Sequence, residues 1–314
     1  MSWCAREPQW NDRKARVFDT SGGEVFAREY GGRNDRLGVL LHGLGGSSDH
    51  WYDVALHMGG CARVLAIDIP GFGRSSPPRD GDYSIASAAV ALCEVIQQVR
   101  GGPVHLVGHS FGAVIAVDIA GAFPEMVDTL SLISPAMPDY RPQPRRLADP
   151  KLALAVFPFM RQWRLRQLES LSHAERARRM IDLCFANPGK LDQDRLKAFV
   201  EEMEARGLQD WSEEALWRSG RALVSRWLWG PSLWSVAAKL HVPCLVICGV
   251  SDRLISPRVA RKTANVVPNA TFVTIEECGH VPHLEHPAVV ARAIERLWTG
   301  GYDHQQRDVA VERD

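Results

Sequence analysis

The sequence lacks an excess of either charge. Its 314 residues include 37 Lys and Arg against 37 Asp and Glu, so the formal net charge is zero. Because phosphate-binding proteins usually show a basic excess or a basic stripe, we expect no nucleic-acid partner. The chain has 46% hydrophobic and 24% charged residues, which is typical of globular proteins and excludes disordered, collagen-like and coiled-coil classes.

Long apolar runs and paired cysteines are also missing. No uncharged apolar run reaches the roughly 18 residues that a membrane-spanning helix requires, and the charged N-terminus lacks the apolar segment of a secretory signal peptide. The seven cysteines are scattered and lack the spacing with histidine that marks a structural zinc site. We therefore predict a soluble, cytoplasmic protein with reduced thiols and no transmembrane segment. The sequence leaves peripheral contact with a membrane and the oligomeric state open.

Short apolar runs alternate with helical patterns along most of the chain. The runs are rich in Val, Ile and Leu without strict alternation, as expected of strands buried on both faces. Strands that alternate with helices form parallel sheets, so we predict an α/β fold with a mostly parallel central sheet flanked by helices. An edge hairpin over 17–19 and 24–30 comes first. The predicted strands are 37–41, 63–67, 104–107, 127–133, 244–248 and 271–275, and the predicted helices are 85–99, 113–122, 258–266 and 288–298.

One interval breaks this alternation. Residues 136–239 show several helical segments and no convincing strand, after a proline-rich start. We predict a helical cap or lid at 136–239 inserted into a core of 24–135 and 240–299, with an N-terminal extension at 1–23 and a polar, fraying tail at 300–314.

Two features of the predicted insertion bear on its packing. It holds six of the ten tryptophans, which we expect to fill the core of the insertion, with some lining a pocket. Its basic stretch, 141–179, is interpreted as a solvated helix face. The alternative is a surface for an acidic substrate tail or an anionic membrane.

Residues 108–112 read Gly-His-Ser-Phe-Gly, directly after a predicted strand and before a helix. In such a nucleophile elbow the serine takes a strained conformation, and the two glycines let the turn close. The Ser110 hydroxyl then stands out from the sheet edge, and the Phe111 N–H lies at the start of a helix, where it can meet an anion. Ser110 is the predicted nucleophile.

A serine nucleophile needs a histidine base that is oriented by a carboxylate. His280 lies just beyond the last predicted strand of the core, and Asp252 follows strand 244–248. The carboxyl ends of parallel strands share one edge of the sheet, so we predict that Ser110, Asp252 and His280 converge there. Asp139 is the alternative acid, and it is less favoured because the adjoining prolines leave its position undefined.

The other candidate polar residues are interpreted as structural. Asp68 ends a strand but lies in a glycine-rich segment, so we expect it to form a turn. A lone histidine is more often structural than catalytic, and we assign that role to His42, His105, His109, His241, His283 and His286.

Negative charge on a tetrahedral intermediate requires N–H donors. The loop His42-Gly43-Leu44-Gly45-Gly46 follows strand 37–41 at the same predicted edge. We predict an oxyanion hole made by the Leu44 and Phe111 N–H groups. The glycine-rich loop matches neither GxGxxG nor GxxxxGK[ST], so nucleotide binding is disfavoured, and the chemistry requires no metal or organic cofactor.

Together these motifs resemble the α/β-hydrolase superfamily. The chain order Ser, Asp, His matches that family, as do the 68–75 turn and the segment 279–282 leading to Glu285 and Pro287. The resemblance covers about 24–135 and 240–299, with the insertion in the position of the family's cap. It implies a carboxylesterase- or lipase-like serine hydrolase with a small apolar acyl or ester substrate.

Two departures from the family's patterns narrow the range of activities that we expect. Family members that open epoxides or remove halides use Asp as the nucleophile, so Ser110 argues against both activities. Carbon–carbon bond hydrolases of aromatic degradation typically carry Trp after the histidine, where this chain has Val281.

We predict a serine hydrolase that cleaves a carboxylic ester, which includes lipid-like and thioester substrates, through an acyl-enzyme. The alternatives are a carbon–carbon bond hydrolase, a cofactor-free haloperoxidase or perhydrolase on the same triad, and a receptor for small hydrophobic ligands on the same fold.

Overall fold

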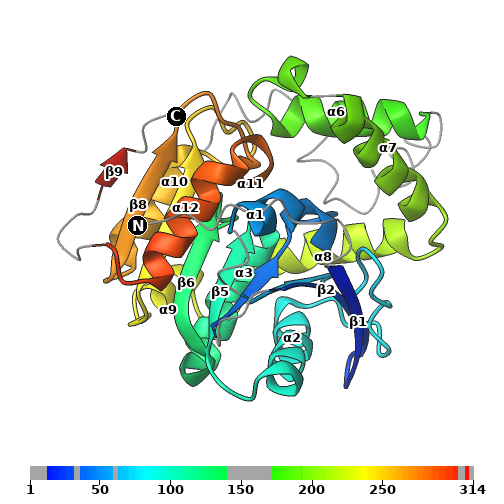
Figure 1. Cartoon of the computed structure of the whole chain (residues 1–314). Helices are drawn as coiled ribbons and strands as arrows, with labels where there is room; N and C mark the ends of the chain where they lie inside the picture. The colour runs from blue at the N-terminus through cyan, green and yellow to red at the C-terminus, as the bar shows by residue number, and fades with distance from the viewer. Residues whose placement is uncertain are drawn as a thin grey trace.

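One mixed sheet runs through the molecule (Figure 1). The computed structural model describes residues 13–31, 36–58, 63–139, 171–191, 193–302 and 308–310. Their nine strands follow the order β1-β2-β4-β3-β5-β6-β7-β8-β9, and β1 and β2 are antiparallel to their neighbours while the rest are parallel. The strands are β1 (Arg13–Thr20), β2 (Gly23–Tyr30), β3 (Leu37–Leu41), β4 (Arg63–Ile67), β5 (Val104–His109), β6 (Val127–Ile133), β7 (Cys244–Gly249), β8 (Ala270–Ile275) and β9 (Asp308–Ala310).

Helices connect the strands and cover both faces of the sheet. The α-helices are α1 (Tyr52–His57), α2 (Ile85–Val99), α3 (Phe111–Ala122), α6 (His173–Cys184), α7 (Gln193–Gly207), α8 (Ser212–Leu228), α9 (Leu233–Ala237), α10 (Pro257–Val266), α11 (Pro282–Glu285) and α12 (Pro287–Trp298). The short 3₁₀ helices are η1 (Ser48–Trp51), η2 (Pro124–Met126) and η4 (Pro188–Lys190). The predicted α/β fold with a mostly parallel sheet is confirmed, and β3, β4, β6 and α2 have the predicted bounds.

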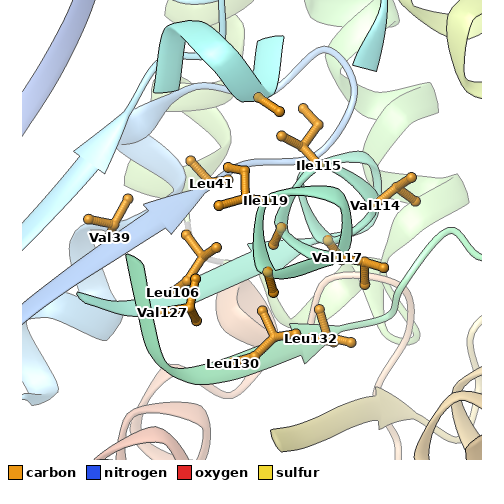
Figure 2. Close-up of a cluster of buried hydrophobic side chains, with 14 of the residues drawn as sticks. Val39, Leu41, Leu106, Val114, Ile115, Val117, Ile119, Val127, Leu130 and Leu132 are labelled. Carbon is orange, nitrogen blue, oxygen red and sulfur yellow. The ribbon is translucent and has the colours of Figure 1, made fainter. Parts of the chain in front are cut away.

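Each central strand contributes to two hydrophobic cores, which is why its sequence shows no alternation. Leu41, Leu106 and Leu130 face the core that α3 covers, as Figure 2 shows. Their chain neighbours Leu40 and Val107 point to the opposite core, beside α1 and α12. The polar side chains that we predicted to meet follow the carboxyl ends of these buried strands.

Both ends of the chain differ from the sequence prediction. Strand β1 begins at Arg13, so part of the predicted N-terminal extension belongs to the sheet. Polar side chains stabilise this edge, because Glu29 pairs with Arg16 at 3.1 Å and with Arg63 at 2.5 Å. The tail was expected to fray throughout, but Asp308–Ala310 forms β9, which pairs with β8. Without β9, β8 would be the edge strand of the sheet, with unpaired N–H and C=O groups along its outer side.

Helices α6 to α9 lie between β6 and β7 in the sequence, and we call them the inserted helices. Their described residues, from 171 to 239 without 192, contain no strand. In Figure 1, α6 and α7 lie together above one end of the sheet. They share a small core, defined by Ala177, Ile181, Phe185, Phe199, Met203, Val281 and Leu284. Two members of this core, Val281 and Leu284, follow His280 in the chain.

Three of the described tryptophans lie outside the core that α6 and α7 share. Within the described residues, the core shared by α6 and α7 is built from aliphatic, Phe and Met side chains. Trp227 and Trp234 pack instead against the core under α3, and Trp229 is 68% exposed. The packing prediction was therefore wrong for these three. Trp163 and the basic stretch up to residue 170 lie outside the described residues.

No helix in the described part of the chain is long and apolar enough to cross a membrane.

Candidate active site

Ser110 lies at a sharp turn between β5 and α3. Its φ of 51° and ψ of −107° place it in a region that non-glycine residues rarely adopt. An added Cβ on Gly108 would lie 2.5 Å from the Gly112 carbonyl oxygen, and one on Gly112 would lie 2.5 Å from the His42 carbonyl oxygen. The two glycines of the motif are thus required by close backbone approach, and the turn has the expected elbow geometry.

His280 contacts both of its predicted partners. Its Nε2 lies 3.0 Å from Ser110 Oγ, and its Nδ1 lies 2.8 Å from Asp252 Oδ2. Both the His280 and Asp252 side chains are buried. The structure therefore brings together the three residues predicted from the sequence, from the ends of β5, β7 and β8.

The Asp252 carboxylate is held by its own loop. Its second oxygen, Oδ1, accepts hydrogen bonds from the N–H groups of Leu254 and Ile255, both at 2.8 Å. These two bonds fix the orientation of the carboxylate. With Oδ2 accepting the Nδ1–H of His280, the Nε2 atom of the ring is left as an acceptor facing the Ser110 hydroxyl.

The backbone of His280 is fixed from two sides. His109 Nε2–H donates to the His280 carbonyl at 2.9 Å, and the His280 N–H donates to the Cys184 carbonyl at 2.7 Å. Burial holds the pKa of His109 well below its usual range, so this ring is neutral. His109 was predicted to be structural, and in the structure its ring contacts the backbone of His280.

The loop after β3 lies directly against the elbow. An added Cβ on Gly43 would lie 2.6 Å from His109 Nδ1 and 3.4 Å from Ser110 Cβ. The loop is closed by a hydrogen bond from Gly46 N–H to the Gly43 carbonyl at 2.9 Å. Within this turn, Leu44 is 37% exposed and Gly45 has a φ of 73°. We call residues 43–46 the glycine turn.

Phe111 is the first residue of α3. The first N–H groups of a helix have no acceptor within the helix, so the Phe111 N–H is available beside Ser110. The structure thus places both predicted donor residues, Leu44 and Phe111, on segments that adjoin Ser110.

Three other candidates have structural roles. Asp68 accepts hydrogen bonds from the N–H groups of Ser48 at 2.5 Å and Arg74 at 2.7 Å, which confirms its role in the turn. His42 is buried, which lowers its pKa to about 3, and its Nε2 accepts from the Ile69 N–H at 2.9 Å. Asp139, the alternative acid, receives two hydrogen bonds from Arg258, at 2.9 and 2.7 Å.

Glu285 was noted in the sequence only as part of a motif. Its carboxylate accepts hydrogen bonds from the Gly279 N–H at 2.6 Å and from the Ala186 N–H at 2.8 Å. It therefore joins the His280 loop to the segment that follows α6. An added Cβ on Gly279 would lie 2.3 Å from the Cys184 carbonyl oxygen, so the two segments are in close contact.

Sequence reasoning missed a row of polar residues on α7 and just beyond it. Arg195 pairs with Asp53 on α1 at 2.5 Å, Glu202 pairs with His50 on η1 at 2.9 Å, and Arg206 donates to the Gly45 carbonyl. Beyond the helix, Gln209 donates to the Gly73 carbonyl at 2.6 Å. The positions 195, 202 and 206 share one helix face. The helical spacing of these three residues could have been noticed in the sequence. Their partners could not, because they lie about 140–160 residues earlier in the chain.

The described residues contain no group of three or more His, Cys, Asp or Glu side chains arranged to hold a metal ion. The cysteines of this part, which are Cys93, Cys184, Cys244, Cys248 and Cys278, are free. Burial raises the pKa of Cys184 and Cys248 to about 12, so these thiols near Asp252 stay protonated and are poor nucleophiles.

Comparison with known proteins identifies a matching family and several relatives. The model of the "Alpha/beta hydrolase family" matches residues 39–293. A Pseudomonas syringae protein designated a carbamate hydrolase, RutD, is 28% identical over 259 residues, with 82% of this chain and 91% of the relative covered. Lipase 1 of Psychrobacter immobilis is 24% identical over 272 residues, with 84% and 77% covered.

The fold is also similar to solved structures. The crystal structure of a bacterial membrane phospholipase A superposes with a TM-score of 0.75 at 23% identity. The match covers 92% of this chain and 86% of that one. At this identity the likeness concerns the fold.

Proposed function

The chain belongs to the alpha/beta hydrolase family, and from this premise we propose that it is a serine hydrolase that cleaves carboxylic esters through an acyl-enzyme. One observation carries the proposal. His280 is within hydrogen-bonding distance of both Ser110 and Asp252, at 3.0 and 2.8 Å. A nucleophile, a base and an orienting acid in this contact are the requirements of acyl transfer.

In the acylation step, Ser110 Oγ attacks the ester carbonyl carbon while His280 Nε2 takes the hydroxyl proton. The carbonyl oxygen becomes an oxyanion that the Leu44 and Phe111 N–H groups stabilise. The carbon–oxygen bond to the leaving group then breaks, and His280 returns the proton to the departing alkoxide. The products are an alcohol and an acyl ester of Ser110.

Deacylation repeats these steps with water as the nucleophile. His280 Nε2 takes a proton from the water, the hydroxyl attacks the acyl carbon, and the proton passes to Ser110 Oγ as the carbon–oxygen bond breaks. Asp252 holds the His280 ring in one tautomer and stabilises the imidazolium that forms in each half-reaction. A carboxylic acid leaves and the enzyme is restored.

The surroundings of the glycine turn support an apolar acyl substrate. The Leu44 side chain is partly exposed there, and an added Cβ on Gly220 of α8 would contact its Cδ2 at 3.8 Å. Leu216, one turn earlier on α8, lies against Gly45, with Cδ1 3.2 Å from an added Cβ. We propose that the insertion, residues 136–239, is a cap whose α8 presents an apolar face toward the turn. The likeness to Lipase 1 supports the same substrate class.

The proposal is tested by multiple-turnover hydrolysis of p-nitrophenyl esters of increasing acyl length. Wild type and Ser110→Ala are compared with the control variant Ser134→Ala. Ser134 directly follows the neighbouring strand β6, and its backbone φ, 43°, is positive like that of Ser110. We expect wild type and Ser134→Ala to turn over many times, and Ser110→Ala to lose activity by several orders of magnitude. Absence of turnover at every chain length, or turnover that survives in Ser110→Ala, would overturn the proposal.

A further inference from the structure

Arg206 and Glu202 of the cap hold the glycine turn that carries one of the proposed oxyanion donors. The Arg206 guanidinium donates through Nη2 to the Gly45 carbonyl, directly after Leu44 in the chain. The same guanidinium lies 3.5 Å from Glu202 Oε1, and Glu202 Oε2 lies 2.9 Å from His50 Nε2. Through these contacts α7 binds the glycine turn at Gly45 and the following helix η1 at His50.

The glycine turn is restrained by the elbow on one side and by an apolar contact from Leu216 of α8 on the other. Gly43 rests on His109 and Ser110, and the Gly46 N–H closes the turn on the Gly43 carbonyl. Gly45 has a left-handed φ of 73°, and glycine loses more conformational entropy on ordering than any other residue. A turn with three glycines therefore has little intrinsic stiffness, and its cap-facing carbonyl is the group that Arg206 binds.

The position of the N–H donors is critical in an oxyanion hole, because they stabilise the oxyanion from about 2.7–3.1 Å. Misplacement by about 1 Å can cost on the order of 10²-fold in rate. We propose that Arg206, itself oriented by Glu202 and His50, is a positioning residue that holds the glycine turn in the orientation in which the Leu44 N–H meets the oxyanion. This inference rests on the proposed function, since it assigns a role within the same site.

A second arginine allows the positioning of the glycine turn to be distinguished from attachment of the cap to the core. Arg226 of α8 also joins the cap to the core, through two hydrogen bonds to Asp118 of α3 at 2.8 and 2.7 Å. The Arg226–Asp118 pair is about as buried as the Arg206–Glu202 pair. It lies on α3, after the elbow, and does not contact the glycine turn. Arg226→Met is therefore a matched control that removes a cap-to-core arginine without touching the glycine turn.

The experiment measures kcat, KM and the inhibition constant of a trifluoromethyl ketone for wild type, Arg206→Met, Arg206→Lys and Arg226→Met. A trifluoromethyl ketone adds to the serine and forms an oxyanion, so its affinity reports on the hole. For Arg206→Met we expect kcat to fall about 10- to 100-fold with KM within about twofold, and inhibitor affinity to fall in parallel. Arg206→Lys should recover part of both losses, and Arg226→Met should keep both near wild type.

Other outcomes have defined meanings. If Arg206→Met keeps wild-type kcat and inhibitor affinity, or if Arg226→Met loses as much of both, Arg206 only attaches the cap and the inference is wrong. The proposed function survives that result as long as wild-type turnover depends on Ser110. If wild type itself shows no Ser110-dependent turnover, the proposed function fails, and this inference fails with it. Thermal unfolding of each variant, with an unchanged transition for Arg206→Lys, checks that the comparison is made on folded protein.

Discussion

Nδ1 of His280 lies 2.8 Å from Oδ2 of Asp252, and both side chains are shielded from solvent. In Asp252→Asn the amide oxygen takes the Oδ1 position, where two backbone N–H groups donate to it, so an NH2 donor replaces the acceptor that faces His280 Nδ1. The size of the side chain stays the same. We predict that Asp252→Asn lowers kcat by about 10⁴-fold. Steady-state hydrolysis of a p-nitrophenyl ester measures the effect. Asp139→Asn is the control, because Asp139 pairs with Arg258, and an equal loss in that variant would contradict the assignment.

Ser110 and His280 should act as one unit. We predict that Ser110→Ala and His280→Ala each reduce kcat by several orders of magnitude, and that the double variant is little worse than either single one. The physical reason is that the base has no proton to take once the serine hydroxyl is gone. Rates of all three variants, measured at one pH with one ester, test this. Losses that multiply in the double variant would show that the two residues act independently.

The elbow should not accept a methyl group at Gly112. An added Cβ there would lie 2.5 Å from the His42 carbonyl oxygen and 2.6 Å from that of Leu41. We predict that Gly112→Ala lowers the free energy of unfolding by on the order of 1–3 kcal/mol through overpacking. Urea unfolding provides the measurement. Gly189→Ala, where nothing lies within 4 Å of the added Cβ, should be nearly neutral, and equal stability of the two variants would refute the explanation.

The His50–Glu202 pair should give stability a defined pH dependence. Burial opposes the charge on Glu202, but the charges of His50 and Arg206 lower its pKa from the ordinary 4.5 to about 2. Its contribution is present above 4.5 and is lost as pH falls toward 2. Burial also opposes charge on His50, yet Glu202 and the nearby Asp49 raise its pKa above the ordinary 6.5. That contribution is present below 6.5 and is lost as pH rises through the raised value.

We therefore predict that wild type exceeds His50→Gln in free energy of unfolding most clearly between about pH 4.5 and pH 6.5. The difference should shrink toward about pH 9 and again toward about pH 3. Urea unfolding of both proteins across this range is the measurement. A difference that stays constant from about pH 5.5 to about pH 9 would be inconsistent with the charged pair.

The central strands could be predicted from the sequence, because strands buried on both faces consist of nearly continuous apolar residues. Val127–Ile133, for example, is predicted with the bounds it has in the structure. The edges of the sheet were not readable in this way. Strand β1 begins among charged residues, of which Arg16 pairs with Glu29 on β2, and β9 is held by its pairing with β8.

The same distinction applies to the candidate site. Ser110, Asp252 and His280 each follow a strand, so the topology of a parallel sheet brings them to one edge. The contacts of α7 could not be predicted, because Glu202 and Arg206 are ordinary surface residues on a helix until the fold brings His50 and Gly45 against them. His109 also gave no sequence signal of its contact with the His280 carbonyl, which lies far along the chain.

Covalent trapping with diethyl p-nitrophenyl phosphate identifies the nucleophile. Attack by Ser110 Oγ on phosphorus forms a serine phosphate ester and releases p-nitrophenolate, while the serine proton passes to His280. We expect one equivalent of p-nitrophenolate per chain, loss of esterase activity, and a single diethylphosphoryl group mapped by mass spectrometry to Ser110. Wild-type protein that hydrolyses esters but carries no adduct, or carries it on another residue, would show that Ser110 is not the nucleophile.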